Sequence, residues 1–296
     1  MKIFVTGGTG FVGNEVVRQL LAVGYRVRCL VRDPARALQR LPAAVELIQG
    51  DLCDPAGYRA ALDGCEAVIH LVGIIVEKGG ATFELVHAKG TADLVRAAGE
   101  FRIKRFVHMS ALGSRPDTES RYFRTKHEAE QSVLRSGMKT TIFRPSVIFG
   151  PEDHFVNVLA GIIRLAPIIP VIGDGERKVQ PIFIGDVASC VGLSVGNPES
   201  HGKIYSLGGP KVMTYNQLHQ SIAQALGLQK RLAHMPIALA KVGAVLAERL
   251  PRPPITREQL ILLQEDNICD PSDAIKDFRL ELKEFDVGIR EYLKPA

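Results

Sequence analysis

The stretch Thr6-Gly7-Gly8-Thr9-Gly10-Phe11-Val12-Gly13 decides the fold of this 296-residue chain. It follows the apolar run Lys2–Thr6 directly and opens a segment, 12–23, whose apolar residues recur at helical spacing. Glycines at such a strand-to-helix turn let the backbone approach a pyrophosphate, which then lies at the helix N-terminus. Glycines alone also fit a tight turn, but this context favours a dinucleotide site.

Short β-branched runs alternate with longer helical patterns through the first half of the chain. The runs are 26–31, 45–48, 67–72, 105–109 and 141–144, and the helical patterns 83–101 and 122–135 lie among them. Alternation of this kind predicts βαβ units and a parallel sheet buried on both faces. We therefore expect an α/β fold, a Rossmann-like doubly wound sheet with a smaller, mainly helical C-terminal lobe.

Changes in the sequence pattern, together with the positions of prolines and glycines, predict the domains. Residues 1–150, with strands and helices returning at about 178–210, form the expected dinucleotide-binding domain, and 151–296 the substrate loops and C-terminal lobe. Prolines and glycines interrupt 151–181, which predicts loops folded over a site. A later helical pattern, 236–250, is apolar over much of its circumference. We expect it to pack on the sheet; a substrate channel, a homodimer face or contact with a membrane surface or complex are the alternatives.

Charge and cysteine content limit the kinds of ligand and cellular environment that we expect for this protein. The formal net charge is +5, and five arginines lie between positions 26 and 40 without interleaved aromatic residues. This pattern favours a small phosphate-bearing ligand over nucleic acid. The five cysteines are scattered without a C-x-x-C pair, which predicts a cytoplasmic protein with neither a disulfide frame nor a metal site. The most apolar stretch, 155–172, contains Arg164, Pro167 and Pro170, so we expect no transmembrane segment.

The end of the second run bears on the choice between NAD and NADP. An acid there binds the ribose 2′-hydroxyl of NAD, and a basic residue suits the 2′-phosphate of NADP. The chain offers both in Val31-Arg32-Asp33, but Asp33-Pro34 also has the pattern of a helix N-cap. Arg32 is then the first residue after the predicted strand, and Arg36 follows one helical turn later. We expect NADP(H) to be favoured over NAD(H).

Tyr122 and Lys126 stand four residues apart, on one face of a predicted helix. A free phenol has a pKa of about 10, and a nearby cation lowers it by roughly one to three units. Tyr-x-x-x-Lys also arises by chance, but Ser110 strengthens the case. It ends the fifth run, where open α/β sheets place ligands, and its hydroxyl can hydrogen-bond a substrate carbonyl. Asp51 ends the third run and fits either an adenine contact or a turn.

These residues resemble the short-chain dehydrogenase/reductase superfamily, in its extended or atypical branch of NAD-dependent epimerase/dehydratase type. The resemblance rests on 6–13, Asp51, Ser110, Tyr122 with Lys126, and Arg144-Pro-Ser-Val-Ile-Phe-Gly-Pro151. It implies that Tyr122 is the acid/base, that Lys126 modulates it and holds the nicotinamide ribose, and that Ser110 polarises the carbonyl. The cofactor-binding residues are expected to be Gly7, Thr9, Gly10, Phe11, Val12, Gly13, Arg32, Arg36, Asp51, Leu52, Leu71, Val72, Gly73, Lys126 and Pro145.

Departures from the family patterns refine the expected function. Ser110 precedes Ala111-Leu112-Gly113, where family dehydratases have an Asp-Glu pair, and His87 stands where relatives often have Asn in Asn-x-x-Gly-Thr. For His87 the residues leave a core position and an active-site position open, with the core favoured. The chain looks more like the atypical group that includes the nucleotide-binding accessory subunit of mitochondrial complex I and quinone-related reductases.

Two classes of function follow. The first is an oxidoreductase that transfers hydride to or from a carbonyl or alcohol of an apolar small molecule, quinone- or isoprenoid-like. The second is a non-catalytic, NADP-bound assembly or stability factor of a larger complex, because catalytic residues are sometimes degraded in the group that the chain resembles. A nucleotide-sugar epimerase is a further alternative. The presence of Ser110, Tyr122 and Lys126 together favours the enzyme.

Overall fold

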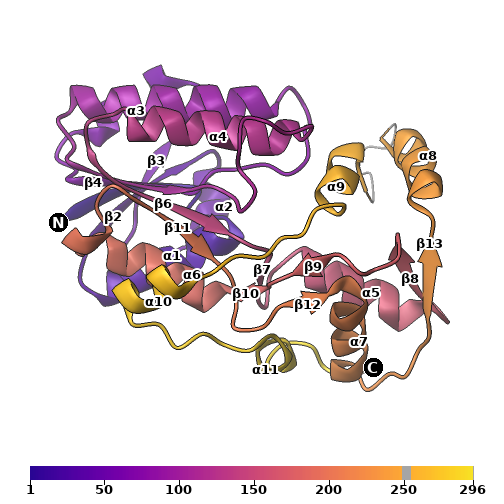
Figure 1. Ribbon diagram of the computed structural model, residues 1–296. Coiled ribbons are helices and arrows are strands. Elements are labelled where there is room, and N and C mark those ends of the chain that lie inside the picture. Colours follow the sequence, from indigo (N-terminus) through magenta and orange to yellow (C-terminus); the bar gives the residue numbers. More distant parts are fainter. Residues whose placement is uncertain (249–254, 296) are drawn as a thin grey trace. The chain divides into compact units, whose positions relative to one another are not determined.

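The computed structural model describes residues 1–248 and 255–295 and divides into two compact units (Figure 1). The first unit comprises Met1–Pro145, Ile184–Leu207 and Pro271–Leu280, and the second comprises Ser146–Phe183, Gly208–Asp270 and Glu281–Ala296. Within the described ranges no helix is both long and apolar enough to cross a bilayer.

The first unit is built on a seven-stranded sheet in the order β11-β6-β5-β4-β1-β2-β3, with every neighbouring pair parallel. Chain order reverses between β1 and β4, which makes this the switch point of a doubly wound fold. The predicted fold class is therefore confirmed. The strands are β1 (Lys2–Thr6), β2 (Arg26–Val31), β3 (Glu46–Gln49), β4 (Ala67–His70), β5 (Arg105–Met109), β6 (Lys139–Pro145) and β11 (Lys203–Leu207).

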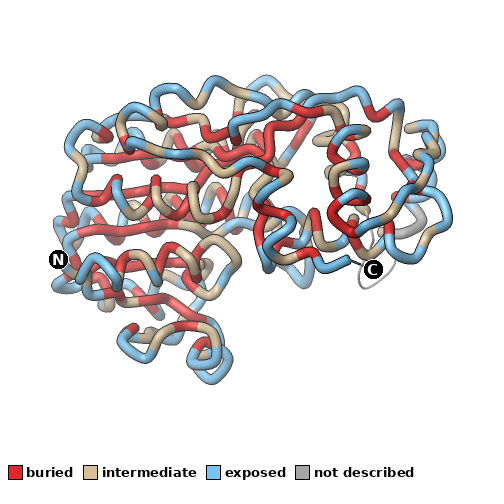
Figure 2. The backbone as a smooth tube through the Cα atoms, turned by 90° about the horizontal axis from the view of Figure 1, so that it is seen from below, coloured by how far each residue is buried: buried red, intermediate tan, exposed pale blue. Residues whose placement is uncertain are grey.

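Helices cover both faces of this sheet, α3 and α4 on one and α1, α6 and α10 on the other (Figure 1). Every residue of β4 and β5 is buried, as a parallel sheet covered on both faces requires. Figure 2 shows long buried segments, in red, running through the chain between exposed turns. The helices and short turns are α1 (Phe11–Ala22), α2 (Pro34–Leu38), η1 (Pro55–Gly57), η2 (Arg59–Leu62), η3 (Glu84–Lys89), α3 (Gly90–Glu100), α4 (Arg121–Leu134), α6 (Ile184–Ser194), η4 (Pro198–Ser200) and α10 (Ser272–Phe278).

The predicted helix 83–101 is divided in the structure. Its first part, η3, is a π-helical turn, and α3 continues from Gly90. Periodicity cannot reveal such a widened turn, because one inserted residue changes the spacing only locally. Turns of this type are frequent at functional sites.

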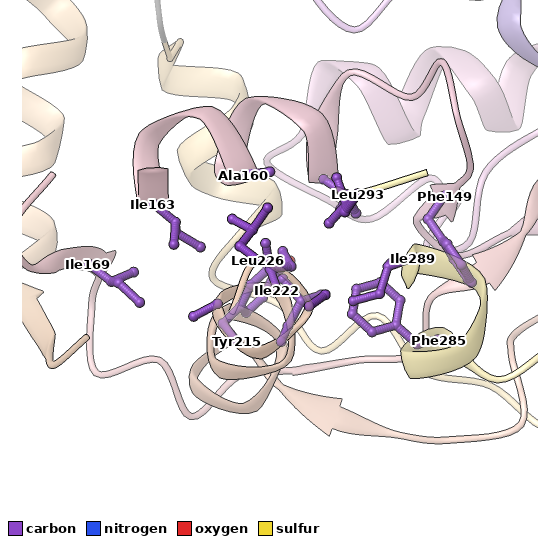
Figure 3. Packing of buried hydrophobic residues seen from close by; sticks show 14 of the residues in the cluster. Phe149, Ala160, Ile163, Ile169, Tyr215, Ile222, Leu226, Phe285, Ile289 and Leu293 are labelled. Carbon is purple, nitrogen blue, oxygen red and sulfur yellow. The ribbon is translucent and has the colours of Figure 1, made fainter. Parts of the chain in front are cut away.

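The second unit is mainly helical and has its own core. In Figure 3, Ala160 and Ile163 of α5 face Ile222 of α7 and Leu226, which follows that helix directly. Three two-stranded sheets complete the unit: β7 (Ile148–Phe149) with β10 (Ile182–Phe183), β9 (Lys178–Val179) with β12 (Met213–Thr214), and β8 (Ile169–Ile172) with β13 (Leu232–Met235). Its helices are α5 (Phe155–Leu165), α7 (Tyr215–Ala225), α8 (Ile237–Ala247), α9 (Arg257–Leu262) and α11 (Phe285–Arg290).

Two expectations for this half were wrong. Residues 151–181 are not mainly loops, because α5 occupies 155–165; Asp153 Oδ1 accepts a hydrogen bond from Val156 N and so caps its first turn. Residues 271–280 belong to the first unit and not to the C-terminal lobe, because Phe278 packs against Phe143 and Tyr205 at ring distances of 5.8 and 5.0 Å. The predicted helix 236–250 corresponds to α8, and its expected end lies outside the described residues. Besides these two, the expected packing of this helix on the sheet was wrong, because its buried Ala240 and Ala244 pack with Leu260 of α9 inside the second unit.

Candidate active site

The glycine turn between β1 and α1 is tight enough to require glycine. Gly7 has a positive φ of 80°, and a Cβ there would lie 3.0 Å from the backbone of Leu71 and Val72. A Cβ on Gly13 would lie only 2.0 Å from the carbonyl oxygen of Gly7. Gly10 N donates to that same oxygen at 3.0 Å. The turn therefore brings the first turn of α1 close to the end of β4.

The N-terminus of α1 fits the phosphates of a dinucleotide. Its N-cap is Gly10, which has no side chain to occupy the N–H groups of the first turn, and no acid follows in that turn. Asn14, one turn later, is buried, and its Oδ1 has no hydrogen-bond partner among the described residues. Thr9, Phe11 and Val12 are partly exposed around the turn.

The end of β2 presents two cations. Asp33 Oδ1 accepts from Arg36 N at 3.1 Å, so this carboxylate caps α2. Arg32 and Arg36 are both exposed at this strand end. A cofactor phosphate that reaches this edge would meet two guanidinium groups and a carboxylate already engaged by the backbone.

Two further strand ends flank the same edge. Asp51 Oδ1 accepts from Cys53 N at 2.8 Å, as a turn aspartate does, while Leu52 is buried beneath Gly90. Leu71 N continues the β4 ladder to Thr6 O at 3.1 Å. The backbone of 71–73 therefore extends β4 beside the glycine turn.

Helix α4 carries the predicted tyrosine and lysine. It begins after Ser120, whose side chain accepts from Phe123 N at 3.1 Å. Tyr122 and Lys126 lie one turn apart, and the Lys126 ammonium donates to Met109 O at 3.0 Å. Met109 is the last residue of β5 and precedes Ser110. The lysine therefore joins α4 to the strand end that carries the predicted serine.

Burial strongly affects the Lys126 ammonium. It lowers the pKa of Lys126 to about 8, while the negative charge of Glu130 acts in the opposite direction. Glu130 lies one turn further along α4, is fully buried, and accepts from Arg144 Nε at 2.8 Å. The sequence did not single out this ion pair, although Arg144 belongs to the Arg-Pro-Ser-Val motif. It places an anion on the same helix face as the buried lysine.

The Ser110 hydroxyl is buried and paired. Its oxygen lies 3.1 Å from Ser114 Oγ, and Ser114 Oγ donates to Ala111 O at 2.8 Å. A hydroxyl has one hydrogen, so Ser110 must be the donor within the serine pair. The backbone holds this strand end in place: Ser110 N donates to Phe143 O at 2.7 Å, and Leu112 N to Pro145 O at 2.9 Å.

The Tyr122 ring is half-buried among other rings. Its centroid lies 5.8 Å from Phe83, 5.4 Å from His87 and 5.6 Å from Phe123. The expected lowering of the Tyr122 pKa by a nearby cation was wrong, because burial raises the pKa of Tyr122 to about 12. The phenol therefore keeps its proton at neutral pH in the absence of ligands and can act as a proton donor.

His87 is a buried residue that lies close to Gly73, as Lys126 does. Its Nε2 accepts from Ile74 N at 3.0 Å, and Nδ1 lies 3.0 Å from Thr125 Oγ1. Because Nε2 accepts, Nδ1 carries the hydrogen, and burial beside Lys126 lowers the pKa of His87 to about 2. A Cβ on Gly73 would lie 3.0 Å from Lys126 Nζ and 3.7 Å from His87 Nε2. The unusual residue in His87-Ala-Lys-Gly-Thr was the only sequence signal for this contact.

Two more histidines lie beneath the site on adjacent strands. His70 is bonded to Thr6 Oγ1 at 2.6 Å and Thr91 Oγ1 at 2.9 Å, and burial lowers its pKa to about 3. His108 stacks on His70 at 5.2 Å, and neither of its ring nitrogens has a hydrogen-bond partner among the described residues. Burial lowers the pKa of His108 well below its usual value. Both histidines are therefore uncharged at neutral pH.

Comparison with known proteins identifies the family. The model of the NAD dependent epimerase/dehydratase family matches residues 3–208, which include the glycine turn, Ser110, Tyr122 and Lys126. The chain belongs to the NAD-dependent epimerase/dehydratase family. This family implies an NAD(P)-binding site, and the cradle at α1 fits such a cofactor.

Proteins with different names are similar to this chain. The chain is 29% identical over 294 residues to NADH dehydrogenase [ubiquinone] 1 alpha subcomplex subunit 9, mitochondrial, of Arabidopsis thaliana, covering 96% of this chain and 73% of that protein. It is 30% identical over 238 residues to the ceramide reductase of Caulobacter vibrioides, covering 79% and 73%. A UDP-glucose 4-epimerase structure from Thermus thermophilus, in complex with NAD, has a TM-score of 0.76 at 20% identity and covers 99% of each chain. That last likeness shows the fold alone.

Proposed function

We propose that this protein is an NADP(H)-linked oxidoreductase that interconverts a carbonyl and an alcohol on an apolar substrate. The observation that carries the proposal is the position of Lys126, whose buried ammonium joins the helix of Tyr122 to the strand end of Ser110. Carbonyl reduction needs a proton donor and a polarising group at one oxygen, and these three residues are of the right kinds.

Proton transfer is the task of Tyr122 in this proposal. When bound, the nicotinamide supplies or accepts the hydride. The phenol is protonated at neutral pH because burial raises the pKa of Tyr122 to about 12. It can therefore donate to the substrate oxygen, and the Lys126 cation, one turn away, stabilises the phenolate that remains. Lys126 would also hold the nicotinamide ribose, and the turn at Gly7, Gly10 and Gly13 the pyrophosphate.

Ser110 would polarise the substrate carbonyl after a small rearrangement. Its hydrogen points to Ser114 in the structure, so the hydroxyl must rotate toward the substrate to donate to it. This costs one neutral hydrogen bond, whose net contribution is about 1 kcal/mol, and the new bond to the substrate replaces it. Ser114 stays satisfied through its bond to Ala111 O.

An apolar substrate and an NADP cofactor each have support. Rings of Phe83, His87 and Phe123 surround Tyr122, so an apolar carbonyl compound suits its neighbourhood. The relative from Caulobacter vibrioides is named for a lipid, ceramide. Arg32 and Arg36 are exposed at the end of β2, while Asp33 is engaged as a helix cap, which favours a 2′-phosphate.

The test is NADPH oxidation with a panel of long-chain ketones and quinones, with UDP-glucose included as an epimerase substrate. We expect turnover of at least one apolar carbonyl compound and a slower reaction with NADH. Conversion of UDP-glucose alone would replace the reductase by an epimerase. Absence of turnover across the panel, together with tight NADP binding, would move the assignment to a non-catalytic role.

That non-catalytic role has one specific observation in its favour. The Ser110 hydroxyl and the Lys126 ammonium are both buried and already bonded within the protein, to Ser114 and to Met109 O. A cofactor in such a site can stabilise a component of a larger complex, and the similar Arabidopsis protein is named as a subunit of one. This second candidate would be supported if the protein shows no turnover and binds a stable protein partner, and if the Tyr122→Phe variant still binds that partner.

A further inference from the structure

Helix α5 has apolar residues on two opposite faces. One face, Val156, Ala160 and Ile163, is buried in the core of the second unit, where Figure 3 shows the last two facing α7. The other face bears Val158, Ile162 and Leu165, whose spacing of four and three residues places them in one stripe. A helix that is apolar all round is normally covered on both sides.

The second face is open to solvent in the described structure. Val158 is 54% exposed, Ile162 40% and Leu165 89%, and Ile168, just beyond the helix, is 51% exposed. These four residues are called the outer ridge below. Exposed apolar residues gathered in one stripe are characteristic of an interaction site.

Cations gather at the C-terminal end of the outer ridge. Arg164 is exposed beside Leu165 and donates one bond to Lys294 O at 2.8 Å. Lys230 Nζ donates to the carbonyl oxygens of Ile163, Arg164 and Ala166 at 2.6, 3.1 and 2.7 Å. Arg231, also exposed, lies next to Ile168 across the β8–β13 pair, because Ile169 N donates to Arg231 O at 2.9 Å. The basic residues therefore form a rim at one end of the apolar stripe.

The acids on this segment lie at the other end of α5. Asp153 is buried, and its Oδ2 accepts from Gly150 N and from the Tyr292 hydroxyl. Glu152 precedes it and lies 13 positions, more than three helical turns, before Leu165. A shallow depression of about 410 Å³ adjoins the basic rim and is lined by side chains that include Gln220, Gln224, Gln229, Lys230 and Arg231. Amides and cations together suit a phosphate headgroup.

We propose that the outer ridge and its basic rim dock this protein on the surface of an anionic lipid membrane. The acyl region accepts the four apolar side chains, and the headgroups pair with Arg164 and Arg231. The Lys230 ammonium, whose three N–H groups bond to backbone carbonyl oxygens, adds positive charge to the rim without pairing directly. A second copy of the chain fits less well, because a two-fold interface through the same surface brings like charges together. The inference goes beyond the proposed reaction and does not depend on it, since it uses other residues.

Vesicle binding tests the proposal. The full chain should cosediment with vesicles of phosphatidylglycerol and phosphatidylcholine, bind weakly to phosphatidylcholine alone, and dissociate as salt is raised. Leu165→Glu should weaken binding about tenfold or more, through loss of apolar burial and added repulsion. Arg231→Gln should weaken it about fivefold. Leu165 is so exposed that neither folding nor NADPH binding should change.

Val23→Glu is the matched control, because Val23 is a 70% exposed apolar residue of the first unit. It adds the same charge and should bind vesicles as the unmodified protein does, apart from a small nonspecific effect. Equal losses in Val23→Glu and Leu165→Glu would overturn the assigned surface. Failure to bind anionic vesicles would also overturn the proposal. A dimer in analytical ultracentrifugation that the Leu165→Glu substitution dissociates would overturn it as well, because the surface would then be an interface between copies of the chain.

Discussion

The Lys126 ammonium and the Met109 carbonyl oxygen lie 3.0 Å apart in the interior of the first unit. An ammonium has three donors, and this bond uses one of them to fix α4 against the C-terminal end of β5. Gly73 leaves the space above the amine open, since a Cβ there would lie 3.0 Å from Nζ. A single lysine thereby joins the tyrosine helix, the serine strand and the extension of β4.

Cofactor choice should depend on Arg32. NADPH should bind more tightly than NADH, and Arg32→Gln should lower NADPH affinity about tenfold while leaving NADH affinity nearly unchanged, because it removes a charge-assisted bond to the 2′-phosphate. Calorimetry measures both affinities. Arg59→Gln is the control, since Arg59 pairs with Glu100 on the surface. Equal affinities of the unmodified protein for the two cofactors would contradict the assignment.

The glycine turn should be essential for binding. In Gly10→Ala the added methyl group would lie 3.1 Å from Gly7 O, a contact that small shifts relieve, but it would crowd the anion cradle at α1. We expect the melting-temperature increase with saturating NADP to be mostly lost. Gly99→Ala is the control, because a Cβ at Gly99 meets no atom of the described structure within 4 Å. An undiminished increase in Gly10→Ala would place the cofactor elsewhere.

His87 should support both stability and the site. His87→Ala leaves the Ile74 N–H without its acceptor and should lower the free energy of unfolding by about 1–3 kcal/mol, measured in urea. His87→Gln retains an oxygen that can accept this bond, so it should recover part of the loss. If Gln is no better than Ala, the hydrogen bond to Ile74 is not what His87 contributes.

Acid should destabilise the fold through the buried histidines. Their folded pKa values lie below the unfolded value of about 6.5, so they favour the folded state above that pH and this advantage is lost as pH falls below it, by about 1.4 kcal/mol per unit for each histidine. His108→Leu removes one such group and should flatten the fall in stability between pH 6 and pH 4. The control is the exposed His154→Leu. An unchanged slope in His108→Leu would show that His108 is not buried as described.

Local patterns were enough to predict the sheet and the glycine turn, because each strand and its following helix are encoded by their own periodicity. The bonds of Lys126 to Met109 and of His87 to Ile74 were not predictable, because they join residues 17 and 13 positions apart whose meeting depends on packing. The prolines also led to the wrong prediction of loops over 151–181, because Pro167 and Pro170 follow α5 and do not interrupt it. The packing of Phe278 against the first unit could not be predicted, because nothing in the sequence around it indicates which unit it joins.

The central claim is that Tyr122 delivers the proton, and the most direct measurement compares two tyrosine-to-phenylalanine variants on the substrate found in the carbonyl panel. Tyr122→Phe should fold normally, bind NADPH normally, and lower NADPH-dependent turnover by about a hundred- to ten-thousandfold. Tyr58→Phe makes the same change at a buried phenol whose oxygen has no hydrogen-bond partner among the described residues, and it should leave turnover unchanged. Turnover in Tyr122→Phe equal to that in Tyr58→Phe would contradict the account.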